Sequence, residues 1–188
     1  MDEKIIIKKA IQGDDNSFNS LVNPYIKQAH QTAYLLLHDY ALAQDAVQEA
    51  LIQIHSSLKR FDPNKASLKT WINRIVVNCS LKQKSKQRFT LKLQDNYEYN
   101  HNPEKEYMLK EEEQFLIDMV KTLKEKYQTV IVLHYFQELS ISEIALTLNI
   151  REGTVKSRLY NARKKLKKVV LSNNSDISFR GDSIWKES

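Results

Sequence analysis

The sequence predicts an all-α fold of two small helical domains joined by a flexible linker. Nearly every periodic segment repeats its apolar residues at intervals of three to four, the spacing of one helix face. The 188 residues include only three Gly and three Pro, whereas a β-rich fold needs both residue types at its many turns. This length suits one domain or two small ones.

The predicted helices follow one another along the chain with short connections. They span residues 4–12, 16–37, 41–60, 67–87, 106–123, 125–137, 141–148 and 152–171. The segment Leu93 to Glu106 has no apolar period and contains Asn102-Pro103, a turn signal. The tail is rich in Ser, Asn and Asp, which favours disorder. We therefore expect domains at 1–92 and 113–171, a linker at 93–112 and a disordered tail at 172–188.

The composition indicates in which cellular compartment the protein acts and what kind of partner it binds. A net charge of +6 favours nucleic acid or another acidic surface as partner. The lone Cys79 excludes an internal disulfide and fits a reducing compartment. The first residues, MDEKIIIKKA, carry acids where a signal peptide needs basic charge, and AYLLLHDYALA is too short to cross a bilayer. We expect a soluble, cytoplasmic protein.

The sequence gives little support to an enzyme. The five histidines, at positions 30, 38, 55, 101 and 134, show no metal-binding spacing. No Gly-rich phosphate loop is present in the sequence, and Cys79 falls on the face of a predicted helix that should be buried. We expect no catalytic residue, no metal and no cofactor.

The C-terminal half has the pattern of a helix-turn-helix. Ser140 to Glu143 matches a capping box, in which a Ser hydroxyl and a Glu carboxylate satisfy exposed backbone N–H groups. A short helix follows, with apolar residues on one face, and ends at Asn149, which tolerates a left-handed turn. A second, longer helix begins near Glu152. This order is typical of DNA-binding motifs whose second helix enters the major groove.

The second helix, GTVKSRLYNARKKLKK, has seven Lys or Arg and no acid. The helical period turns four residues inward: Val155, Leu159, Ala162 and Leu166. The opposite face carries Ser157, Tyr160, Asn161 and Lys164, flanked by Lys156 and Arg163 on one side and by Thr154, Arg158 and Lys165 on the other. Asn can pair with adenine and Lys with guanine. A solvated basic helix would explain the charge but not the capped helix placed upstream.

Two further faces lie in the N-terminal half. In ALAQDAVQEALIQI, the residues opposite the buried side are Asp45, Gln48, Glu49 and Ile52. Acid, amide and apolar groups together suit docking on a basic protein surface, although an ordinary wet face is the alternative.

A stripe on the next predicted helix consists of Trp71, Arg74, Asn78 and Lys82, after the turn signal Asp62-Pro63-Asn64. Aromatic, amide and basic groups suit stacking on unpaired bases and following a phosphate backbone. The alternatives are a core position for Trp71 and a solvated surface for the basic residues.

Taken together, AQDAVQEALIQI, FDPNKASLKTWINRIVVN and LKEKYQTVIVLHYFQELSISEIALTLNIREGTVKSRLYNARKKL resemble the extracytoplasmic-function (ECF) sigma factors. The similarity covers about residues 16–90 and 113–170. The family consists of small bacterial initiation subunits that retain only sigma domains two and four. The resemblance implies core RNA polymerase and promoter DNA as partners, a cognate anti-sigma protein at the membrane, and a role in a stress or envelope response.

The resemblance also implies roles by position. Asp45, Gln48, Glu49 and Ile52 would dock on the clamp helices of the largest polymerase subunit, and the loop 62–68 would capture a flipped base. The expected minus-ten contacts are Asn64, Lys65, Trp71, Arg74, Asn78 and Lys82. The expected minus-thirty-five contacts are Arg151, Thr154, Lys156, Ser157, Arg158, Tyr160, Asn161, Arg163 and Lys164.

Four positions depart from the family pattern. Lys82 stands where Asp is usual, Lys124 where Pro is usual, and Gln128 and Asn161 where Arg is frequent. The last change removes a guanine-type contact, so promoter preferences of the family should not be transferred. The rival interpretation is a helix-turn-helix regulator that acts without polymerase, which would not need the face around Asp45.

Overall fold

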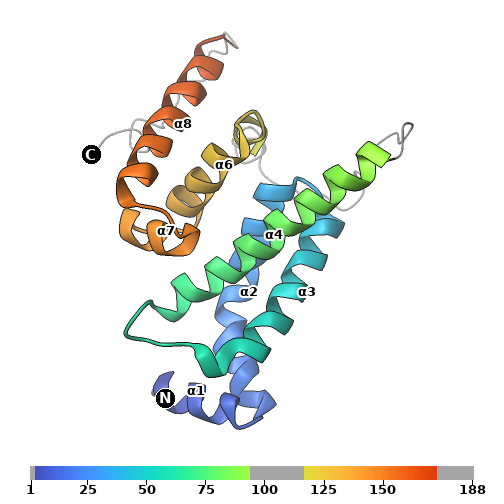
Figure 1. Cartoon of the computed structure of the whole chain (residues 1–188), viewed down its shortest axis with the longest axis vertical. Coiled ribbons are helices and arrows are strands. Elements are labelled where there is room, and N and C mark those ends of the chain that lie inside the picture. Colours follow the sequence, from blue (N-terminus) through green and yellow to red (C-terminus); the bar gives the residue numbers. More distant parts are fainter. Residues whose placement is uncertain (1–2, 94–116, 173–188) are drawn as a thin grey trace. The chain divides into compact units, whose positions relative to one another are not determined.

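The computed structural model describes residues 3–93 and 117–172, and every regular element in these two ranges is helical (Figure 1). The backbone separates into two compact units, residues 1–106 and 107–188. The predicted all-α fold is confirmed. Most of the predicted linker, and the predicted tail from residue 173 onward, lie outside the described residues.

The first unit is a bundle of α1 (Glu3–Ile11), α2 (Asp15–Leu37), α3 (Tyr40–Ser57), the short η1 (Leu58–Arg60) and α4 (Leu68–Leu93). Helices α2, α3 and α4 pack against one another, and α1 packs on α2. The connection between α2 and α3 is two residues long and satisfies both helix ends. His38 ends α2 in a left-handed conformation with φ 56°, and the Asp39 carboxylate accepts a bond from the Leu42 N–H at 2.9 Å.

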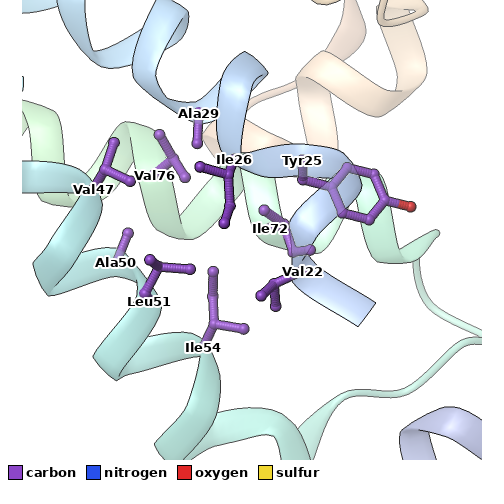
Figure 2. A pocket seen from close by; sticks show the side chains of 10 residues that line it. All are labelled: Val22, Tyr25, Ile26, Ala29, Val47, Ala50, Leu51, Ile54, Ile72 and Val76. Carbon is purple, nitrogen blue, oxygen red and sulfur yellow. The ribbon is translucent and has the colours of Figure 1, made fainter. Parts of the chain in front are cut away.

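The core of this unit lies between α2, α3 and α4 (Figure 2). Val22, Ala29, Val47, Ala50 and Val76 are among the aliphatic side chains that meet there. The void they leave is about 10 Å³, room for no more than one water molecule. This void is too small to hold a ligand, so we place the candidate binding sites on the outer faces of the helices.

Helix α4 is longer than predicted: it was expected to end at residue 87, and it continues to Leu93. Its start is capped by Ser67, whose hydroxyl accepts a bond from the Thr70 N–H at 3.2 Å. Lys84 helps to fix the far half of the helix by donating to the Leu36 carbonyl at the end of α2, at 2.6 Å. Apolar periodicity fades after residue 81, but Lys, Gln and Arg are good helix formers and sustain the helix.

The second unit contains a helical turn at 117–121, then α6 (Glu125–Ile131), η3 (Val132–Phe136), α7 (Ile141–Leu148) and α8 (Glu152–Ser172). Helix α8 packs on α6 and α7. The prediction of one regular helix at 125–137 was wrong in its second half, where η3 is a π-helix. The chain then turns at Glu138, which has φ 55°.

None of the helices in the described ranges is both long enough and apolar enough to cross a membrane.

Candidate nucleic-acid and protein interfaces

The predicted capping box and turn of the helix-turn-helix are both present. The Ser140 N–H donates to Glu143 Oε2 at 2.9 Å, and the Glu143 N–H donates to Ser140 Oγ at 3.3 Å. Helix α7 ends at Asn149, which has φ 52° and ψ 48°. The next residue closes the turn, because the Ile150 N–H donates to the Ala145 carbonyl at 3.0 Å. These contacts fix the direction in which α8 leaves α7.

The inner face of α8 is the one that the sequence predicted. Its four predicted residues are buried: Val155, Leu159, Ala162 and Leu166. They share the core of the second unit with Ile144 of α7, which is also fully buried. The rotation of α8 about its axis is therefore set by packing.

The predicted minus-thirty-five residues lie on the outside of this helix or at its flanks. Exposed residues are Arg151, Lys156, Ser157, Tyr160, Asn161 and Lys164, and half-buried residues are Thr154, Arg158 and Arg163. Tyr160 is 61% exposed, although an aromatic ring of this size is usually covered. The only acid of α8 is Glu152, in its first turn. The outer face therefore presents basic, amide and aromatic groups together.

Two side chains on this face are tied to the helix backbone. Asn161 Nδ2 donates to the Ser157 carbonyl at 2.8 Å, and Ser157 Oγ donates to the Thr154 carbonyl at 3.0 Å. An amide has two N–H donors and one oxygen acceptor. After its bond to Ser157, Asn161 still has one donor and the oxygen, the pair that matches the major-groove edge of adenine.

The stripe on α4 has an aromatic end and a polar end. Trp71 is half-buried, and its ring lies 5.2 Å from that of Phe61 at an interplanar angle of 49°. Part of the indole therefore packs in the core and part faces solvent. Arg74, Asn78 and Lys82 are exposed and follow at helical spacing.

The side chain of Asp62 holds the loop before α4 in shape, a role that the sequence analysis did not predict. Asp62 Oδ1 accepts from the Asn64 backbone N–H at 3.0 Å and from its side-chain amide at 3.1 Å. Lys65 Nζ lies 3.6 Å from the other carboxylate oxygen. The backbone bond from Asn64 is the main cause that lowers the pKa of Asp62. The sequence Asp62-Pro63-Asn64 could have predicted this role, since Asp before Pro-Asn favours a turn closed by the Asp side chain.

The polar face of α3 is as exposed as predicted, with one exception. Asp45, Gln48 and Ile52 are exposed, and 71% of Ile52 is open to solvent. Glu49 is half-buried, and its Oε1 lies 2.6 Å from Nζ of Lys82.

The ion pair connects two surfaces that the sequence assigned to different partners. Next to it, the Cys79 thiol donates to Gln53 Oε1 at 3.3 Å. Burial raises the pKa of Cys79 to about 11, so this thiol is uncharged at neutral pH. No sequence pattern could have revealed the pair, because Glu49 and Lys82 are 33 residues apart.

The helix-turn-helix unit and the helical bundle with its basic and aromatic stripe are the two parts expected of a sigma-70 protein, and two family profiles match them and place the chain in this class. "Sigma-70 region 2" matches residues 21–90, and "Sigma-70, region 4" matches residues 116–166.

Curated relatives point to one branch of this class. The ECF RNA polymerase sigma factor SigW of Bacillus subtilis (strain 168) is 31% identical over 86% of this chain and 93% of its own length. The ECF RNA polymerase sigma-E factor of Haemophilus influenzae is 28% identical over 87% of this chain and 93% of its own length.

A solved structure has the same fold. The sigma factor RpoE of Bartonella quintana, crystallised with the anti-sigma factor NepR, aligns with a TM-score of 0.68 at 21% identity, over 82% of this chain and 96% of that one. The chain belongs to the ECF RNA polymerase sigma factor family. It is therefore a transcription initiation factor rather than a classical enzyme or a regulator that acts without polymerase.

Proposed function

We propose that this sigma factor docks on core RNA polymerase through one face of α3 and holds promoter DNA through α4 and α8. The docking face consists of Asp45, Gln48, Glu49 and Ile52. The exposure of Ile52 supports the proposal most directly, because a large aliphatic side chain gains by being covered. An apolar centre with a polar rim is the usual composition of a protein interface.

The minus-ten site is the α4 stripe together with the loop at 62–68. The exposed part of Trp71 can stack on an unpaired base, while Arg74 and Lys82 can follow the phosphates of the open strand. Holding an unstacked base lowers the cost of opening the duplex by about a few kcal/mol. The hydrogen bonds of Asp62 support this role, because they shape the loop before DNA arrives.

The minus-thirty-five site is the outer face of α8. The residues from Lys156 to Asn161 would meet base edges, and the basic residues from Arg163 to Lys168 would mainly meet phosphate. Phosphate contacts position a protein on DNA, whereas base contacts select the sequence.

The remaining expectations concern partners and cellular context. The Bartonella quintana relative was solved with an anti-sigma factor, and we extend this kind of partner, held at the membrane, to the present chain. We also propose action in the cytoplasm, in a stress or envelope response. The division into domains at 1–92 and 113–171 with a linker at 93–112 remains part of the proposal.

Core binding by variants of the α3 face tests the docking surface. Asp45→Asn and Ile52→Ala should each weaken binding to purified core polymerase by about tenfold or more, as truncation of a central interface residue does. Asp15→Asn is the matched control, since it removes an exposed carboxylate elsewhere in the same unit. Wild-type affinity in both α3 variants would refute the docking surface.

A further inference from the structure

The ion pair between Glu49 and Lys82 joins the two proposed surfaces of the first unit. Glu49 belongs to the polymerase-docking face of α3, and Lys82 belongs to the minus-ten stripe of α4. Their charged atoms are 2.6 Å apart. In the free protein, each surface therefore neutralises a charge that the other surface needs for its own partner.

The pair can open without any movement of the helices. The Lys82 side chain is 73% exposed and the Glu49 side chain is 38% exposed. An exposed pair of this kind adds little to stability and exchanges partners easily. Beneath it, α3 and α4 are held by buried residues such as Ala50 and Val76. Only the two side chains have to change rotamer when a partner arrives.

We infer that docking of core polymerase on Glu49 releases Lys82 for the phosphate backbone of the open minus-ten strand. The inference rests on the proposed function, because it assumes the two surfaces named there. A basic group of polymerase that takes the Glu49 carboxylate leaves Lys82 without its anion. The positive charge that Lys82 already carries is then no longer neutralised by Glu49, and it can bind the phosphates of the open strand.

The neighbouring groups do not replace Glu49 as the partner of Lys82. Cys79, one turn before Lys82, keeps its proton at neutral pH. Asp45 lies one turn before Glu49 on α3, exposed to solvent and available to the polymerase. Coupling of this kind is reciprocal, so a strand held by Lys82 also strengthens polymerase docking.

The variant Lys82→Gln tests the exchange. It frees Glu49 permanently, so it should bind core polymerase about two- to fivefold more tightly than wild type. In the same variant, holoenzyme should bind a single-stranded minus-ten oligonucleotide more weakly. Lys86→Gln is the matched control for core binding, because it removes the same charge from the next turn of α4, and that charge lies outside the pair with Glu49.

The double variant Glu49→Gln/Lys82→Gln separates exchange from a simple change of net charge. Against the Glu49→Gln background, Lys82→Gln should give no gain in core affinity. An equal gain in that background, or no gain in the single variant, would overturn the inference. If Asp45→Asn loses core affinity but Lys82→Gln gains none, only the coupling between the two surfaces is rejected. If Asp45→Asn and Ile52→Ala both bind core polymerase as tightly as wild type, the docking face itself is rejected.

Discussion

At the scale of single residues, we propose that Asn161 contributes to the choice of promoter. Its amide is held against the Ser157 carbonyl at 2.8 Å, with one donor and one acceptor left over. An Arg at this position, as is frequent in the family, would offer donors only and would suit guanine. This sigma factor should therefore prefer adenine at the base pair that Asn161 contacts.

Asn161→Arg should reorder the promoters that this sigma factor uses. Run-off transcription from templates that differ at single minus-thirty-five positions would show the new order, with a discrimination of about 1–3 kcal/mol for one good base contact. Lys164→Gln provides the comparison, since loss of a phosphate contact weakens all templates alike. Identical ranking by wild type and Asn161→Arg would show that this residue does not read sequence.

Cys79 gives a residue-scale prediction about reactivity. Its pKa rises from 9.0 to about 11 because the thiol is buried, and the nearby Glu49 carboxylate adds to the rise. The native protein at pH 8 should therefore react with a thiol reagent about a hundredfold more slowly than the unfolded chain, in proportion to the thiolate fraction.

The raised pKa of Cys79 also makes the free energy of unfolding depend on pH. The unfolded chain loses the thiol proton first, so the stabilising contribution is present below pH 9 and is lost as the pH rises towards 11. In the thiol-reagent experiment at pH 8, equal rates of reaction for the folded and the unfolded protein would contradict the burial of Cys79.

At the scale of elements, the capping box makes the helix-turn-helix sensitive to one hydroxyl. Ser140→Ala should lower the free energy of unfolding of the second unit by about 1 kcal/mol, because the Glu143 N–H loses its acceptor. Chemical denaturation followed by circular dichroism measures the loss. Lys167→Ala, at an exposed site on α8 of the same unit, should have little effect. A loss as large in the control would mean that the cap is not the cause.

The buried stripes and caps could be predicted because they depend on local sequence. Val155 and Leu159 follow the 3.6-residue period, and Asn149 takes the left-handed conformation that its side chain tolerates. The interior Pro24 does not end α2, since flanking residues such as Val22 and Ala29 hold the helix in the core.

Features that arise from packing between elements could not be predicted. The extension of α4 to Leu93 depends partly on Lys84 reaching the end of α2. The pair between Glu49 and Lys82 likewise requires α3 and α4 to be packed side by side. The π-helix at 132–136 has no signal in the apolar period of the sequence. The departure from Pro at Lys124 is compatible with the fold, because φ −62° and ψ 143° is a conformation that Pro itself adopts.

At the scale of the whole molecule, we propose that the two units, each with its own DNA surface, act together in recognising one promoter. The proposed linker at 93–112 would raise the effective concentration of the second unit once the first is bound. Neither surface alone would then have to bind tightly, and specificity would come from engaging polymerase, the minus-ten strand and the minus-thirty-five duplex at the same time. The net charge of +6 makes all of the DNA contacts sensitive to salt.

Run-off transcription from a genomic fragment library tests the central claim most directly. Core polymerase plus this protein should give discrete products from a subset of fragments, and core polymerase alone should not. Asp45→Asn should abolish most of that yield through weak core binding, while the control Asp15→Asn should retain it. Absence of any promoter-specific product with wild-type protein, under conditions where another sigma factor supports transcription, would contradict the account.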